Sequence, residues 1–552
     1  MWDRHDQFQC MATNQDDLRD VREDHRAIIL VKGVDAVPRT HGSMDWAGLQ
    51  RSVDRQNGAF APPNTVHKSF QHASSIIPRS KTPTWVLRAS MIFSLFSLTI
   101  LLAPGVSTAA GPSRPNVIVI LTDDQGRGDY SAFGTKDIRT PAIDRLCREG
   151  MTFDNFRANS CVCSPTRAAL LTGCFPDRVG VPGVIRHTHN DSWGWLAPHA
   201  VLLPQILKSQ GYHSAIVGKW HLGLASPNTP TERGFDFFHG FLGDMMDDYL
   251  THRRGGQNFM RRNHDVIDPE GHATDLFTDW ACDYLAERAK AQTRSDAARP
   301  NTPFFLYLAY NAPHDPIQPP TAWREKVRQR EPDMAEARVG LVALIEQMDA
   351  GIGKVLETLD RLKLADNTLV FFTSDNGGLL RHQANNGPWR SEKQHMYEGG
   401  LRVPAIARWP NHIESGSHTA RSAVTMDLFA TIADAAGATT PQGIDGISFL
   451  PTLLGQASAE NALADAQREL YFVRREGGSA YGGKTIEALI QGDWKLIQDN
   501  PFQPLELYNL AVDPQESRNR IHEEQAIAAR LSALLRKHIQ NGGQVAWQRP
   551  TQ

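Results

Sequence analysis

The sequence Asn116-Val-Ile-Val-Ile-Leu-Thr122 is followed at once by Asp123-Asp124. A short run rich in branched apolar residues, with no polar alternation, is typical of a strand buried on both faces of a parallel sheet. Two adjacent carboxylates at the end of such a strand are unfavourable unless a positive charge neutralises them. The stretch therefore indicates a parallel sheet with a charged site at its carboxyl edge.

Similar apolar runs follow along the chain, and helical patterns lie between them. The runs are 213–217, 304–309, 369–373 and 403–407, and the helical patterns are 141–149, 168–172, 200–210, 275–290 and 338–359. Strands that alternate with helices predict an α/β fold in which helices cover both faces of a large, doubly wound, mostly parallel sheet. We assign this main domain to residues 114–445.

The pattern changes after residue 445. Short strand-like runs separated by Gly, Asp and Pro lead into a helical stretch at 523–539. The runs are 470–475, 486–490, 494–497 and 505–508. They predict a smaller α+β subdomain at 446–552, in which an antiparallel sheet is covered by one helix.

The N-terminal region has two parts. Residues 1–90 are mostly polar and lack apolar periodicity, so we predict either disorder or a misplaced start codon, with Met91 as the true first residue. Segment 91–110 has a basic flank, an apolar run and a small-residue end, which is typical of a signal peptide. We expect an exported protein, periplasmic or secreted. The alternative is a membrane anchor preceded by a cytoplasmic tail.

Composition and net charge exclude few classes of function. The formal net charge is -3 over 552 residues, so we expect no nucleic-acid partner, and the oligomeric state stays open. Five of the six cysteines follow Cys10. Three of these, Cys161, Cys163 and Cys174, lie close together, but no histidine or second Cys-x-x-Cys pair completes a zinc site.

A second oxygen-rich strand end follows the run 369–373. There the chain continues as Ser374-Asp375-Asn376-Gly377. Either segment alone can be a turn or a helix cap. Because two strand ends of one sheet carry such groups, we expect Asp123, Asp124, Asp375 and Asn376 to share one hard divalent cation, calcium or magnesium.

The segment Cys163-Ser-Pro-Thr-Arg167 predicts the start of a helix. Pro165 suits a first helical turn, so residue 163 lies at a helix N-terminus, where anions are favoured. Arg167, one turn further on, can bind an anionic substrate with a forked guanidinium. The alternative is a buried helix with an incidental cysteine. Beyond the run 213–217, Lys219 and His221 are cation and acid/base candidates, or else surface residues.

These motifs together resemble those of the type I sulfatases, a family of the alkaline phosphatase superfamily that includes arylsulfatases and N-acetylgalactosamine-6-sulfatases. Cys163-x-Pro165-x-Arg167 followed by Ala-Ala-Leu-Leu-Thr-Gly173 is similar to the family signature. Other family-like segments follow in order at 211–223, 310–316, 389–404 and 506–514. The resemblance implies that 114–445 is a catalytic sulfatase domain.

The resemblance also implies the chemistry of the site. Cys163 would be converted to formylglycine (3-oxoalanine) by a formylglycine-generating enzyme, and its aldehyde hydrated to a geminal diol. One calcium ion (Ca²⁺) would be bound by the modified residue 163 together with the strand-end oxygens. The remaining implied roles are sulfate binding by Arg167 and Lys219, assistance to the diol by His221, and a position beside the leaving oxygen for His314 and Lys393.

Lys393 departs from the family pattern in one respect. Family members often carry glycines around this lysine, whereas here its neighbours are Ser391, Glu392, Gln394 and His395.

The expected function is hydrolysis of an aryl or carbohydrate sulfate ester. One alternative is a phosphonate monoester hydrolase or phosphodiesterase of the same superfamily. A second is a surface-exposed binding protein without catalysis. The natural substrate, a sulfated small molecule or carbohydrate, is not identified by any residue.

Overall fold

The computed structural model describes residues 114–293, 302–477 and 483–549. The predictions for the extension 1–90 and the signal segment 91–110 therefore lie outside the described residues. The chain divides into two units, and all the described residues belong to the second, Gly105–Gln552. Within the described ranges, no helix has the length and apolar character that a membrane crossing requires.

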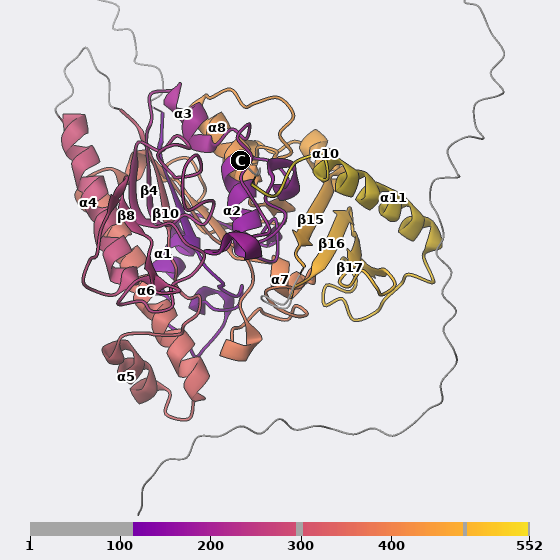
Figure 1. Ribbon diagram of the computed structural model, residues 1–552, viewed down its shortest axis with the longest axis horizontal. Helices are drawn as coiled ribbons and strands as arrows, with labels where there is room; N and C mark the ends of the chain where they lie inside the picture. The colour runs from indigo at the N-terminus through magenta and orange to yellow at the C-terminus, as the bar shows by residue number, and fades with distance from the viewer. Residues whose placement is uncertain (1–113, 294–301, 478–482, 550–552) are drawn as a thin grey trace, which may run out of the picture. The chain divides into compact units, whose positions relative to one another are not determined.

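A ten-stranded mixed sheet forms the centre of this unit (Figure 1). In spatial order its strands are β13 (Ser417–Thr419), β2 (Met151–Phe153), β12 (Ala405–Arg408), β11 (Thr368–Ser374), β1 (Asn116–Thr122), β10 (Phe304–Ala309), β4 (His213–Lys219), β5 (Phe237–Phe241), β8 (Met260–Arg262) and β9 (Asp265–Val266). The central strands from β11 to β5 are parallel. Antiparallel strands extend the sheet on both sides.

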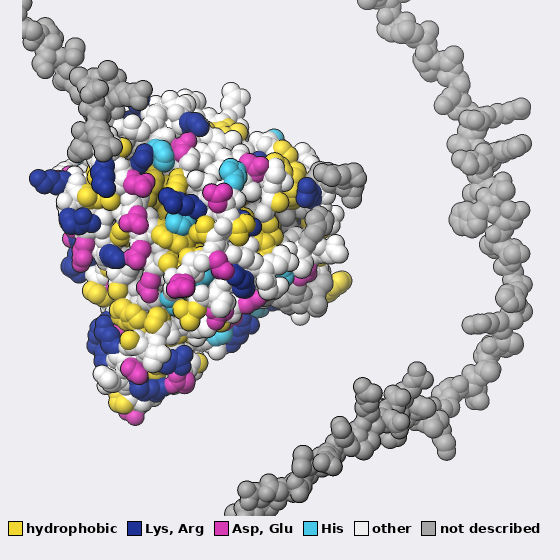
Figure 2. Space-filling view, turned by 60° about the vertical axis from the view of Figure 1, so that its left-hand side comes forward, with side chains coloured by type: hydrophobic (Ala, Val, Ile, Leu, Met, Phe, Trp, Pro, Cys, Tyr) yellow, Lys and Arg dark blue, Asp and Glu magenta, His cyan; other side chains and the backbone are white. Residues whose placement is uncertain are grey.

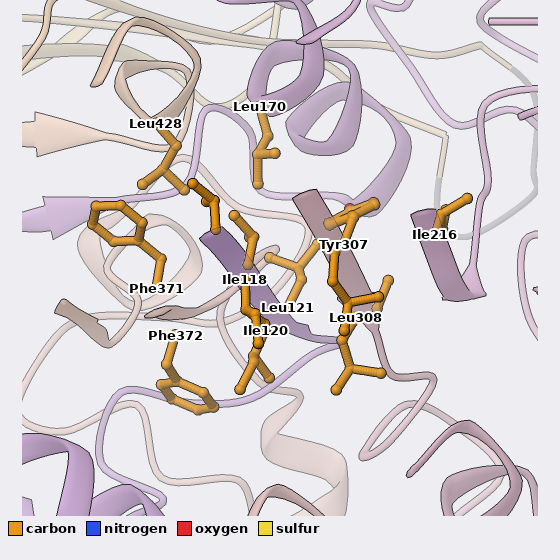
Figure 3. Close-up of a cluster of buried hydrophobic side chains, with 14 of the residues drawn as sticks. Ile118, Ile120, Leu121, Leu170, Ile216, Tyr307, Leu308, Phe371, Phe372 and Leu428 are labelled. Carbon is orange, nitrogen blue, oxygen red and sulfur yellow. The ribbon is translucent and has the colours of Figure 1, made fainter. Parts of the chain in front are cut away.

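Helices cover both faces of the sheet, which confirms the predicted doubly wound α/β fold. One group consists of α1 (Pro141–Glu149), α4 (Ala273–Thr293), α5 (Thr321–Arg330) and α6 (Glu336–Arg361), which pack on one another. The other consists of α2 (Cys163–Thr172), α3 (Leu203–Lys208) and α8 (Asp427–Ala436). In Figure 3, Leu170 of α2 and Leu428 of α8 approach the strands from one side, and Phe372 points to the other.

A four-stranded antiparallel sheet follows near the C-terminus, as predicted. Its strands are β15 (Glu469–Arg475), β16 (Thr485–Gln491), β17 (Trp494–Gln498) and β18 (Glu506–Asn509), and helix α11 (Gln525–Gly542) packs on β16 and β17. Two short helices that were not predicted precede it, α9 (Leu450–Leu453) and α10 (Ala459–Gln467). The subdomain boundary between 445 and 446 stays a prediction.

Short elements complete the described structure. They are the paired strands β3 (Phe156–Arg157) and β14 (Ala423–Val424), the paired strands β6 (Arg253–Arg254) and β7 (Gln257–Asn258), and helix α7 (Glu398–Leu401). Acidic and basic side chains are interspersed over the face of the molecule that Figure 2 shows.

A buried ionic cluster joins the small sheet to the main domain. Glu398 lies 2.7 Å from Nη2 of Arg157 and 2.8 Å from Nζ of Lys495, a residue of β17. Lys495 also lies 2.7 Å from Glu516. All four side chains are buried, and removing one partner of such a cluster leaves an uncompensated charge. The cluster thus holds the small sheet, including β15, against the main domain.

Candidate active site

The predicted metal ligands lie together at the ends of two neighbouring strands. Strands β1 and β11 pair in parallel with Thr122 opposite Ser374, so the residues that follow them begin side by side. The backbone N–H of Asp124 donates to Oδ1 of Asp375 at 3.2 Å. Asp124 adopts a φ of 67°, a left-handed conformation that is uncommon outside glycine and often marks a functional turn.

Helix α2 brings Cys163 and Arg167 to the same place. The helix begins at Cys163 after the extended residue Val162, and Sγ of Cys163 lies 3.5 Å from Oδ1 of Asp123. One turn further, Arg167 donates to Oδ2 of Asp375 from Nε at 3.1 Å and from Nη2 at 2.8 Å. The arginine therefore binds a carboxylate of the site in a forked arrangement and is itself fully buried.

Lys219 and His221 reach the site from the end of β4. Nζ of Lys219 lies 2.5 Å from Oδ2 of Asp123. Nε2 of His221 lies 2.8 Å from the carbonyl oxygen of Ile185. A carbonyl can only accept, so Nε2 carries the hydrogen and Nδ1 keeps a lone pair, which has no hydrogen-bond partner among the described residues. Burial, and then Lys219 and Arg167, hold the pKa of His221 well below its usual range, so the ring is neutral.

His314 and Lys393 lie on the opposite side of Asp124. Nδ1 of His314 donates to the carbonyl oxygen of Asp315 at 2.9 Å, which leaves Nε2 as an acceptor. The ammonium group of Lys393 lies 3.0 Å from that Nε2 and 2.7 Å from Oδ2 of Asp124. A proton donor and a proton acceptor are thus in contact beside the strand-end carboxylates.

The buried charges of the site cancel. The carboxylates of Asp123, Asp124 and Asp375 face the cations of Arg167, Lys219 and Lys393. Burial raises the pKa of Asp123, but the attraction of neighbouring positive charges, Lys219 first, outweighs it and leaves the pKa below its ordinary value. Asp123 therefore stays ionised despite complete burial.

The unmodified thiol of Cys163 is a weak nucleophile in this setting. Burial raises its pKa well above the ordinary value, and the attraction of Lys393 does not reverse the shift. Because the thiolate is the reactive form, a protonated thiol here is nearly inert.

The donor atoms present fit a hard cation. Nδ2 of Asn376 donates to Oδ1 of Asp124 at 2.7 Å, so the Oδ1 of Asn376 is turned away, and it is buried with no hydrogen-bond partner in the described structure. Ligand atoms of Asp123, Asp124, Cys163 and His314 all lie within 4.8 Å of one another. Carboxylate and amide oxygens are the ligands that calcium and magnesium prefer.

A small pocket, with a volume of about 30 Å³, opens onto the site. Its lining includes four predicted residues, Cys163, His221, His314 and Lys393. It also includes residues that sequence reasoning missed, namely Val162, Val184, Asp244, Met245, Gln394 and Arg474. Arg474 belongs to β15 of the small sheet, and no motif near it in the sequence signals a role in a pocket.

Two residues near Lys393, in the loop where family members often carry glycines, adopt a left-handed backbone conformation. Ser391 and Gln394 adopt φ values of 69° and 75°, the left-handed region that glycine enters without strain. Hydrogen bonds hold the loop there, since N–H of Gln394 donates to the Cys161 carbonyl at 2.9 Å and N–H of Lys393 to that of Gly378 at 3.3 Å. The loop therefore holds its left-handed backbone without glycine at these two positions, at a cost in stability.

Ser391→Gly should raise the stability of the protein. Relief of the left-handed strain is partly offset by the entropy of glycine in the unfolded chain, which leaves a gain of about 0.5 to 1 kcal/mol. A thermal unfolding midpoint higher than that of the wild type would show this gain in stability. Ser391→Ala is the matched control, because alanine keeps the Cβ and should give no gain. Equal stabilisation by both changes would contradict the argument.

The buried carboxylates and the cations that face them suit an anionic substrate, and comparisons with known proteins identify the family. The Sulfatase family model matches residues 115–438, and a model for the C-terminal part of N-sulphoglucosamine sulphohydrolase matches residues 388–542. Human N-acetylgalactosamine-6-sulfatase is 35% identical over 373 residues, covering 63% of this chain and 68% of the human protein. The chain therefore belongs to the sulfatase family.

Solved structures agree with this assignment. The crystal structure of Ps i-CgsB in complex with k-i-k-neocarrahexaose is similar with a TM-score of 0.70 and 28% identity, covering 80% of this chain and 96% of that one. Phosphonate monoester hydrolase of Agrobacterium radiobacter has a TM-score of 0.54 and 20% identity, covering 78% and 96%. The second likeness is more distant and shows the fold alone, so the protein is a sulfatase.

Proposed function

We propose that the protein removes sulfate from carbohydrate sulfate esters, using formylglycine made from Cys163 together with one calcium ion. The observation that carries this proposal is the position of Cys163, at a helix N-terminus beside Asp123 and within the same pocket as His221, His314 and Lys393. The hydrated aldehyde would supply two hydroxyl groups on one carbon, one to attack sulfur and one to release the product, which a thiol cannot do.

Asp123, Asp124, Asp375 and Asn376 would hold the calcium ion with residue 163. When bound, the ion would act as a Lewis acid toward the sulfate oxygens. Because the three carboxylates are already balanced by three cations, the two positive charges of calcium would remain to attract an anionic ester. This charge balance favours an anionic substrate over a neutral one.

The protein side chains would bind the substrate and move its protons. Lys219 and Lys393 would bring their ammonium groups to the negative charge that develops on the sulfate and the leaving oxygen. The lone pair on Nδ1 of His221 can accept a proton from a hydroxyl of residue 163. Nε2 of His314 lies against the Lys393 ammonium, from which it would take a proton and pass it to the departing alcohol.

Sulfated carbohydrate is the substrate class that the relatives support. One is named for N-acetylgalactosamine-6-sulfate, and the structure of another contains a neocarrahexaose. We further propose that a formylglycine-generating enzyme matures the chain, and that segment 91–110 directs export to the periplasm or beyond. Residues 114–445 would form the catalytic domain and 446–552 the smaller subdomain.

A substrate comparison tests the proposed function. Protein produced with a formylglycine-generating enzyme should hydrolyse an aryl sulfate and 6-sulfated hexosamines faster than an aryl phosphonate monoester or a phosphate diester. Turnover is measured as kcat/KM at saturating calcium, with conversion of residue 163 confirmed by mass spectrometry. A higher kcat/KM on the phosphonate would overturn the proposal in favour of the phosphonate hydrolase alternative.

A further inference from the structure

We propose that a second pocket, between the small sheet and the end of helix α11, binds an uncharged sugar residue and so holds a polysaccharide chain on the protein. The pocket has a volume of about 230 Å³. None of its lining residues also lines the active-site pocket. Sugar binding here is independent of the proposed function, whereas its effect on turnover rests on that function.

The two pockets lie on opposite faces of strand β15. Arg474 lines the active-site pocket, and the next residue, Arg475, lines the second pocket. Successive side chains of a strand point to opposite faces of its sheet, so one sugar ring cannot occupy both pockets. A ligand that engages both must be a chain of several sugars.

Two tryptophan side chains form an apolar wall of the second pocket. The indole rings of Trp193 and Trp547 stack with their centroids 5.0 Å apart and an angle of 7° between their planes, and both are partly exposed. The backbone N–H of Trp193 donates to the carbonyl oxygen of Val184 at 2.9 Å, which fixes the start of this side chain. The apolar C–H groups of a sugar ring pack well on such a rigid aromatic surface.

A buried carboxyl group with a spare oxygen lines the same pocket. Asp177, in the short 3-10 helix η2 (Pro176–Val179), is 1% exposed, and its Oδ2 accepts from the hydroxyl of Tyr471 at 3.0 Å. Its Oδ1 is buried and has no hydrogen-bond partner among the described residues. Burial raises the pKa of this carboxyl, and the attraction of Arg475 does not reverse the shift. A sugar hydroxyl can donate to the ionised form or accept from the protonated one, so it suits this group in either state.

Two further residues shape the pocket beside this carboxyl group. A Cβ at Gly542 would collide with the carboxylate of Asp177, so glycine lets the end of α11 come close to it. Thr485 of β16 donates its hydroxyl to the carbonyl oxygen of Glu476 at 3.3 Å, which leaves the hydroxyl oxygen able to accept. An aromatic wall with a few polar groups is the usual make-up of a small-molecule site.

The charges of the second pocket favour an uncharged ligand. Among its lining residues Arg475 is the basic one and Asp177 the acidic one. Nη2 of Arg475 lies 3.1 Å from Asp177, and its Nε lies 3.0 Å from Glu487. The nearby His538, which stacks on Tyr471, is paired with Glu469 at 2.7 Å. Because two carboxylates already face the guanidinium, little positive charge remains to attract a sulfate.

Binding of uncharged oligosaccharides tests the second pocket. The probes are three hexasaccharides, of β-linked galactose, β-linked glucose and β-linked N-acetylglucosamine, each titrated into the full chain by calorimetry. Wild-type protein should bind at least one of them. Trp547→Ala should weaken that binding by about ten-fold or more, the usual effect of truncating a central aromatic residue of a binding site. Trp547→Phe keeps an aromatic ring and should give an affinity between the two.

Trp323→Ala is the matched control for this experiment. Trp323 is a partly exposed tryptophan of α5 that lines neither pocket, so its replacement should leave the affinity unchanged. No binding of any hexasaccharide by the wild type, equal affinities of wild type and Trp547→Ala, or an equal loss in Trp323→Ala would overturn the inference. A larger loss in Trp547→Ala for a sulfated hexasaccharide than for the uncharged one would overturn the assignment of an uncharged ligand.

Turnover of a short and a long substrate separates the second pocket from the active site. For a 6-sulfated monosaccharide, kcat/KM of Trp547→Ala should stay within about two-fold of the wild type, whereas KM for a sulfated polysaccharide should rise about ten-fold, because the chain is no longer held at a second point. An unchanged KM for the polysaccharide would overturn the role in holding the chain. Binding of a hexasaccharide by protein that hydrolyses neither substrate would support the second pocket and overturn the proposed function alone.

Discussion

Cys163→Ala is expected to abolish sulfate-ester hydrolysis, with kcat lower by at least about four orders of magnitude, the range seen when a nucleophile is removed. The fold should stay intact, because the change removes one sulfur atom whose polar neighbour in the site is Oδ1 of Asp123 at 3.5 Å. Turnover of an aryl sulfate and the thermal unfolding midpoint, measured on one preparation, check both expectations.

Cys161→Ala is the matched control for this experiment. Cys161 is equally buried, two residues earlier, but it does not line the pocket. Its replacement should leave kcat per converted molecule unchanged, with conversion measured on the peptide that contains residue 163. Retained turnover in Cys163→Ala would contradict the assignment of the nucleophile, and a lost fold in that variant would contradict the structural argument.

Asp123→Asn is expected to weaken calcium binding by at least about a hundred-fold, because loss of an outer-sphere partner alone costs about 10- to 100-fold. The change removes one of three carboxylates that balance three cations, and it leaves the Lys219 ammonium without the partner at 2.5 Å. The site becomes positive before any metal arrives. Hydrolysis should fall in parallel and recover in part when calcium is added in excess.

Calcium titration of chelator-treated protein, by calorimetry and by activity, measures this effect. Asp349→Asn is the control, since Asp349 is also a buried carboxylate but accepts N–H groups of Ala142 and Ile143 at the start of α1. That variant should keep the calcium affinity of the wild type. Unchanged affinity in Asp123→Asn, or restoration of activity by magnesium and not by calcium, would contradict the proposed metal site.

Much of the main domain could be predicted from local patterns. The runs 116–122 and 304–309 and the helix 141–149 have the bounds that the structure shows, because the two runs are mostly apolar and the helix begins at Pro141 and ends before Gly150. The strands toward one edge of the large sheet were harder to predict. Strand β12 runs antiparallel to β11, and β2 and β13 are only three residues long. Such strands are held by their neighbours, and their own composition does not specify them.

The site residues also fall into two groups, those whose position could be predicted from the sequence and those whose position could not. Residues such as Asp123, Asp375 and Lys219 follow recognisable strands, so their proximity could be inferred from the rule that strand ends share an edge. Arg474 could not, because its position in the pocket depends on how a separate sheet packs against the main domain. Nor could the left-handed backbone at Ser391, which hydrogen bonds to distant residues impose.

The burial of Cys163 limits the time at which the chain could be modified. The side chain is 3% exposed at the first turn of α2, so the proposed modifying enzyme would reach it only before that helix is packed. Maturation and folding would then compete for the same nascent polypeptide. A chain that folds first would keep its thiol, and the yield of active enzyme would be set by the ratio of two rates. Slower folding in a host with a fast modifying enzyme would raise the specific activity of the product.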